Sequence, residues 1–180
     1  MPRVADGTLA PPLPQEGVGF PKIPSVIYNG RAHTGDLWDF GPLFDQGMLT
    51  ILPPRLVGTP YPSLVPTTDA DGNDVAGIRL PEVGAPLATY TGWALRAVPA
   101  DANDGCDAAG QKIDFARTLA ERVGANDPRP SIQERYPTHD AYVLAVAAVA
   151  NDLHGQRLLL EEDRQTYIAA AEASEIGRFP

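Results

Sequence analysis

The chain has 180 residues, of which 43% are hydrophobic and 21% are charged, and 14 basic against 23 acidic side chains give a formal net charge of −9. This length suffices for one domain with its own core. An acidic chain without a cluster of Lys and Arg is not expected to bind nucleic acid or an anionic membrane. No run reaches the roughly 18 apolar residues of a membrane-spanning helix, and prolines at positions 11, 12 and 14 interrupt any apolar signal sequence. We therefore expect neither a membrane span nor a signal peptide, and the sequence assigns no compartment.

Residues 1–47 are expected to form an extended, proline-rich strap. Each proline fixes φ, removes a backbone donor and restricts the residue before it, which favours extended or polyproline backbone. Apolar side chains recur along the segment, so we predict that it lies on another surface, either this chain's own or that of a missing partner. These side chains are Leu9, Leu13, Phe20, Ile23, Val26, Ile27, Trp38, Phe40, Leu43 and Phe44.

Residues 48–96 are expected to form a small β region of short strands. Apolar runs at residues 47–54 and 61–66 are typical of strands near a sheet edge, because prolines lie beside both. Residues 69–74 then combine Asp, Gly and Asn, which favour a turn. We therefore predict a hairpin that returns as a strand over residues 75–80.

Beyond residue 96 the composition shifts towards helix formers. Residues 97–111 hold closely spaced Asp, Asn and Gly and are expected to be a loop. Residues 112–180 are expected to form a bundle of three or four helices. The first of these is predicted over residues 112–123, where apolar positions share one face, and Gly124 is placed to end it.

Three further signals place helix starts in the C-terminal part. Ser131 and Glu134 have the spacing of a capping box, Thr138 is a suitable N-cap for a helix over residues 139–153, and residues 161–163 supply acidic side chains to the first turn of the last helix. The sequence therefore predicts an α+β fold, with a proline-rich, β-containing half followed by helices, in one structural unit.

Residues 64–96, with the sequence LVPTTDADGNDVAGIRLPEVGAPLATYTGWALR, resemble the C-terminal part of a bacterial family of esterase-like α/β-hydrolase-domain proteins. The family's pattern there is V-P-x-x-D-A-D-G-N-x-V-A-G-I-R-L-P, followed by P-L-A-T-Y-T-G-W. The likeness covers nearly the whole chain, including RVADGTL at residues 3–9, FART at residues 115–118, DPRPSIQERY at residues 127–136 and RLLLEED at residues 157–163.

The resemblance implies a serine hydrolase whose Gly-x-Ser-x-Gly nucleophile and later histidine lie upstream of the position that matches Met1. No serine of this chain has glycines two residues away on both sides, so we expect no activated hydroxyl and assign no catalytic residue. The implied role is a C-terminal cap or scaffold that shapes the access of a small ester substrate, while a hydrolase core, upstream or on a separate chain, supplies the chemistry. The alternative is a stand-alone binding or protein-interaction module without hydrolase activity. The serines are Ser25, Ser63, Ser131 and Ser174.

The densest cluster of aromatic and hydroxyl groups lies at residues 90–93. Tyr90, Thr91 and Trp93 are our candidates for the wall of a substrate pocket. Arg96 is a fourth candidate, because it would orient a carboxylate, although a surface position is an equal alternative. The alternative for Trp93 is a place in the core, since large aromatic side chains dominate core energetics.

We expect no cofactor and no metal. The motif Asp69-x-Asp71-x-Asn73 resembles the start of a calcium loop, but the sixth and twelfth positions are Asp74 and Leu80 instead of Gly and Glu, so a turn is preferred. The histidines lack a second His or Cys at the short spacing of zinc sites. They are His33, His139 and His154.

Overall fold

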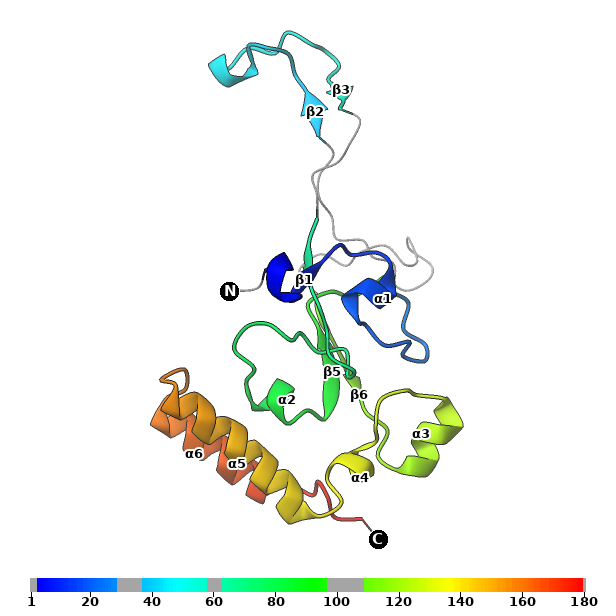
Figure 1. The fold of residues 1–180 in the computed structure, drawn as a ribbon, viewed down its shortest axis with the longest axis vertical. Coiled ribbons are helices and arrows are strands. Elements are labelled where there is room, and N and C mark those ends of the chain that lie inside the picture. The colour runs from blue at the N-terminus through cyan, green and yellow to red at the C-terminus, as the bar shows by residue number, and fades with distance from the viewer. Residues whose placement is uncertain (1–2, 29–36, 58–62, 97–108, 180) are drawn as a thin grey trace.

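The structure, a computed structural model, describes residues 3–28, 37–57, 63–96 and 109–179, and their fold is α+β as predicted (Figure 1). The strands of these residues pair in three separate two-stranded antiparallel sheets. The pairs are β1 (Leu9–Ala10) with β4 (Val65–Pro66), β2 (Trp38–Asp39) with β3 (Arg55–Leu56), and β5 (Ala88–Thr91) with β6 (Gln111–Asp114).

The two longest helices, α5 (His139–Gly155) and α6 (Glu161–Glu172), lie side by side and antiparallel (Figure 1). None of the helices in the described ranges is long and apolar enough to cross a membrane. The shorter helical elements are η1 (Val4–Asp6), α1 (Gln15–Val18), η2 (Phe44–Gln46), α2 (Pro81–Gly84), α3 (Leu119–Ala125) and α4 (Ile132–Arg135).

A hydrophobic core forms where α2, α5 and α6 meet, around the buried side chains of Ala85, Val146 and Ala171. On helix α5, Val146, Ala150 and Leu153 of the predicted apolar face are buried. Helix α2 approaches α5 closely, because a Cβ added at Gly84 would lie 2.8 Å from Cγ1 of Val149. This contact holds α2, and the loop before it, on the helical pair.

The predicted capping interactions are confirmed. The Thr138 hydroxyl accepts a hydrogen bond from the Ala141 N–H at 3.1 Å. Ser131 and Glu134 form the reciprocal capping box, with the Glu134 carboxylate accepting from the Ser131 N–H at 2.8 Å. Thr118 caps α3 with its own capping box, so each of these helices starts where a local polar side chain satisfies its first free N–H groups.

Several predicted strands and one predicted helix are misplaced. Residues 48–54 form no strand, and the return of the hairpin over residues 75–80 is irregular, with a single bridge between Thr68 and Asp74. The helix predicted from residue 112 begins at Leu119, because residues 111–114 pair with β5 as β6. Short apolar runs fit a strand and a helix equally well, and pairing with a distant strand decides between them. Most of the predicted loop at residues 97–111 lies outside the described residues.

The N-terminal strap has two different environments. Val18, Phe20 and Ile23 are buried on this chain's own surface, where the Phe20 ring stacks on Tyr28 at 5.3 Å. The end of the strap belongs to residues 37–57, here called the arm, which contain β2, η2 and β3 and lie apart from the rest of the described chain, at the top of Figure 1.

Candidate functional site

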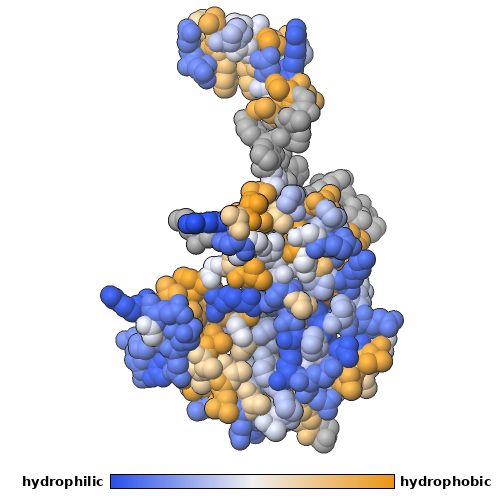
Figure 2. Space-filling view, in the orientation of Figure 1, coloured by the Kyte–Doolittle hydropathy of each residue, from blue (hydrophilic) through white to orange (hydrophobic). Residues whose placement is uncertain are grey.

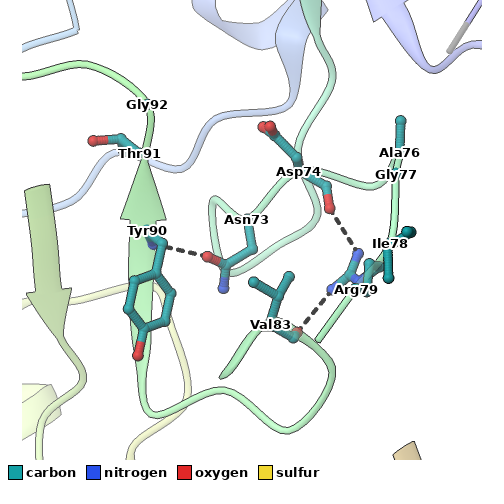
Figure 3. A pocket seen from close by; sticks show the side chains of 10 residues that line it. All are labelled: Asn73, Asp74, Ala76, Gly77, Ile78, Arg79, Val83, Tyr90, Thr91 and Gly92. Carbon is teal, nitrogen blue, oxygen red and sulfur yellow. Dashed lines mark hydrogen bonds between the residues drawn. The ribbon is translucent and has the colours of Figure 1, made fainter. Parts of the chain in front are cut away.

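A pocket of about 340 Å³ opens between the loop after Asn73, helix α2 and strand β5 (Figure 3). Tyr90 and Thr91 come from the strand, and Val83 comes from the helix. The wall combines two hydroxyl groups with several apolar side chains. The lining residues are Asn73, Asp74, Ala76, Gly77, Ile78, Arg79, Val83, Tyr90, Thr91 and Gly92.

Asn73 holds the loop against strand β5. Its side chain is fully buried, its Nδ2 donates to the Ala88 carbonyl at 3.0 Å, and its Oδ1 accepts from the Tyr90 N–H at 2.8 Å. Both groups lie on β5, so the amide satisfies backbone groups that a neighbouring strand would otherwise pair. The position of the pocket wall therefore depends on one buried amide.

The loop itself is shaped by Asp69. One of its oxygens accepts from the N–H groups of Asp71 and Asn73 at 2.9 and 3.0 Å, and the other accepts from Arg79 at 2.6 Å. These contacts give the acidic motif the geometry of a turn, as preferred from the sequence. Among the described residues no group of three His, Cys, Asp or Glu side chains is placed to hold a metal ion.

Arg79 is a structural residue of the pocket wall. Besides Asp69, its guanidinium donates to the carbonyl oxygens of Asp74 and Val83, each at 3.1 Å (Figure 3). These bonds tie the loop to helix α2. The guanidinium is thus engaged with the protein rather than presented to a ligand carboxylate.

Two titratable groups of the wall have shifted pKa values. Burial raises the pKa of the Tyr90 phenol above its ordinary value, so the hydroxyl stays protonated at neutral pH and can donate a hydrogen bond. Partial burial also raises the pKa of the Asp74 carboxyl, against the opposing effect of Arg79. The pocket therefore offers the Tyr90 phenol as a neutral donor beside an apolar surface.

The structure brings two of the four predicted site residues into this pocket. Tyr90 and Thr91 line it, whereas Trp93 and Arg96 are not among its lining residues. Trp93 instead packs in an aromatic cluster, 5.6 Å from the Phe20 ring and 5.8 Å from the Tyr28 ring. Its carbonyl accepts from the Thr91 hydroxyl at 2.6 Å. Trp93 is therefore half-buried against aromatic side chains of the N-terminal segment.

A buried arginine that the sequence did not single out supports strand β5 from its other side. Arg129 is 2% exposed and pairs with Asp127 at 2.6 Å. Its Nη1 also donates to the Thr89 hydroxyl at 2.8 Å, and further bonds reach the carbonyls of Ile113 and Asp114. Burial raises the pKa of Asp127, but the hydrogen bonds from Arg129 outweigh it and hold that pKa below its usual range.

All of these contacts make Arg129 an internal clamp rather than a ligand-binding cation. A buried charge is tolerated only when it is paired and hydrogen-bonded, and this guanidinium meets both conditions. The only sequence signal was its place in the DPRPSIQERY block. A second arginine of that block, Arg135, pairs with Asp71 and lies over the Phe115 ring at 4.3 Å, which ties the pocket loop to α4.

The serines and histidines with described contacts are engaged in structural bonds. The Ser131 hydroxyl donates to the Glu134 carboxylate at 2.7 Å, and that of Ser174 donates to the Ala171 carbonyl at 2.8 Å. The His139 nitrogens lie 2.9 and 3.1 Å from the carbonyl oxygens of Ile176 and Glu172. Among these contacts Ser131 is therefore bonded to Glu134 and not to a histidine.

Comparison with known proteins gives one result. No curated protein and no solved structure shows significant similarity to the chain. A family model described as "Alpha/beta hydrolase domain" matches residues 15–169. This match covers most of the chain, including the arm, the pocket and the helical pair. The chain therefore belongs to the alpha/beta hydrolase domain family.

Proposed function

We propose that this chain is the C-terminal cap or scaffold segment of a bacterial, esterase-type serine hydrolase, and that it shapes substrate access without carrying the nucleophile. The observation that supports this most is the match of residues 15–169 to the hydrolase family in a chain whose four serines all lack the Gly-x-Ser-x-Gly context. That context creates the strained turn on which a hydrolase nucleophile is exposed.

The pocket at Tyr90 supplies the access function. Its apolar wall, with Ile78 and Val83, suits the acyl chain of a small ester, and the Tyr90 hydroxyl is a neutral donor for the ester's carbonyl or alcohol oxygen. Such a contact orients the substrate before the reaction. The serine, the histidine base and the oxyanion hole belong to a core on an upstream segment or a separate chain.

The test uses turnover of a short activated ester such as p-nitrophenyl acetate. The purified chain alone is expected to give no turnover above buffer, whereas the chain produced together with a Gly-x-Ser-x-Gly segment encoded upstream of Met1 should be active. Turnover by the chain alone that a serine-directed phosphonate blocks would overturn the proposal.

The pocket is tested in the active assembly with Tyr90→Phe. Loss of the Tyr90 hydroxyl is expected to raise KM about three- to tenfold with little change in kcat. A hydrogen bond to the substrate that is equally strong in the ground and transition states affects KM alone. The matched control is Tyr167→Phe, which removes a hydroxyl that bonds to Glu82 at 3.1 Å and that does not line the pocket. Equal effects of the two variants would contradict the assignment.

A further inference from the structure

The arm, residues 37–57, exposes its large apolar side chains. Leu52 is 71% exposed, Leu56 is 62% exposed and Phe44 is 51% exposed. Trp38, Met48, Leu49 and Val57 are exposed as well. In Figure 2, this part of the molecule, at the end farthest from the helical pair, shows hydrophobic residues in orange interspersed with hydrophilic residues in blue. Exposed apolar side chains that gather on one element mark an interaction surface.

The arm is nevertheless a folded unit with its own internal contacts rather than a linker. The N–H groups of Thr50 and Ile51 donate to the Phe40 carbonyl at 3.0 and 3.2 Å, and the rings of Phe40 and Phe44 stack at 4.8 Å. A Cβ added at Gly41, where φ is +101°, would lie 1.8 Å from the Thr50 hydroxyl oxygen. The turn therefore closes only with glycine, and the arm has one specific shape.

An isolated two-stranded unit is marginally stable in water, and its free edges are open to pairing. The arm therefore needs a covering surface. Its chemistry indicates which kind: it contains three charged residues, Asp39, Asp45 and Arg55, in a chain of net charge −9. Such a surface suits an apolar protein face better than nucleic acid or an anionic membrane.

We propose that the arm docks on the sheet-bearing core of the hydrolase and is the main contact that holds this cap segment on it. The family match runs through residues 37–57 without excluding them, so the arm is part of the hydrolase domain. A domain buries its apolar elements against its own central layers. The described strands form only two-stranded antiparallel sheets, and the sheet that carries a hydrolase nucleophile is not among them. This inference rests on the proposed function.

The experiment compares two double substitutions of equally exposed leucines. Leu52→Glu with Leu56→Glu changes the arm, and Leu144→Glu with Leu160→Glu changes the helical pair, where these side chains are 69% and 68% exposed. Each variant of the tagged chain is produced with the upstream-encoded Gly-x-Ser-x-Gly segment. Co-purification and ester turnover are measured, and far-ultraviolet circular dichroism checks that α5 and α6 remain folded.

The arm variant is expected to lose at least tenfold in co-purified core and in turnover, and the helix variant to retain both. If the arm variant retains both, the docking inference is overturned while the proposed function stands. If the unaltered chain neither retains a core nor supports turnover, the proposed function fails, and the inference with it.

Two further measurements on the purified chain test whether the arm binds a second copy of the chain or a lipid surface instead. Light scattering that shows an arm-dependent dimer would assign the surface to a second copy. Arm-dependent sedimentation with phosphatidylcholine vesicles would assign the surface to a lipid membrane. Either result would overturn docking on the core. A chain that stays monomeric and does not sediment with the vesicles supports docking on the core.

Discussion

The pocket region and the arm differ in which side chains they bury: polar ones are buried around the pocket, and apolar ones are exposed on the arm. Around the pocket, the buried polar side chains of Asn73 and Arg129 are hydrogen-bonded within the chain: Asn73 bonds to strand β5, and Arg129 bonds to Asp127 and Thr89. On the arm, apolar side chains such as Leu52 and Leu56 are left in solvent. Buried polar groups specify their partners through hydrogen bonds. The chain thus satisfies the buried polar groups of Asn73 and Arg129 by itself, whereas the apolar side chains of the arm have no cover among the described residues.

The largest effect should come from breaking the buried clamp. Arg129→Met leaves the Asp127 carboxylate buried and unpaired, which costs about 3–5 kcal/mol in the free energy of unfolding. Urea denaturation measures this loss in the free energy of unfolding. The control is Lys112→Met, which removes the exposed ion pair with Asp114, whose side chains are 54% and 71% exposed; such pairs contribute about 0–1 kcal/mol. Similar losses for both variants would show that the pocket region is not held by its buried polar groups.

The tight turn at Gly72 should give the next largest effect. Gly72 and Gly77 both have positive φ, +79° and +92°, but a Cβ at Gly72 would lie 2.9 Å from Thr89 Cγ2, whereas one at Gly77 meets nothing within 4 Å. Gly77→Ala should therefore lower the free energy of unfolding only through the strain of a side chain at positive φ, by about 1–2 kcal/mol. Gly72→Ala should lose about 1–3 kcal/mol more in the free energy of unfolding, from overpacking. Equal losses would mean that the loop yields around the added methyl group.

Acid should weaken the helical pair through Glu161. Hydrogen bonds from Arg164, and then from Gln165, lower the pKa of Glu161 from 4.5 to about 2. A group with a depressed folded-state pKa contributes stability that is fully present above the unfolded-state value and is lost as pH falls through the folded-state value. The thermal midpoint should therefore fall between pH 4.5 and 2, and less steeply in Glu161→Gln.

Arg164→Gln provides the matching change on the other partner. Because Glu161→Gln already removes the titrating carboxyl, the double variant should show the pH dependence of Glu161→Gln alone rather than the sum of the two effects. Additive effects would show that Arg164 is not the main cause of the shift in the pKa of Glu161.

The smallest effect on stability is expected from the arm. Because Leu52 and Leu56 are already 71% and 62% exposed, the double substitution to Glu should change the free energy of unfolding of the purified chain by no more than about 0.5 kcal/mol. Urea denaturation followed by the helical signal checks this. A loss of stability as large as that of Gly72→Ala would place the arm in contact with the body and remove the contrast between the two regions.

Local chemistry explains which parts of the fold and the site were predictable. The caps at Ser131 and Thr138 and the helix that starts at Glu161 depend on residues within one turn of each other. The turn at Asp69 is local as well. Tyr90 and Thr91 were chosen for their residue types, and they line the pocket beside that turn.

The remaining features required contacts between residues far apart in the chain. Residues 111–114 became a strand because β5 pairs with them, against a helical apolar pattern. Trp93 packs on Phe20 and Tyr28, more than sixty residues earlier, and so lies outside the pocket. The amino-acid sequence alone determined the starts of α4, α5 and α6, the turn and the α+β class, since each depends on neighbouring side chains. Only the tertiary structure decided the strand pairing, the buried role of Arg129 and the exposure of the arm, because hydrogen-bond partners and burial are properties of the folded surroundings.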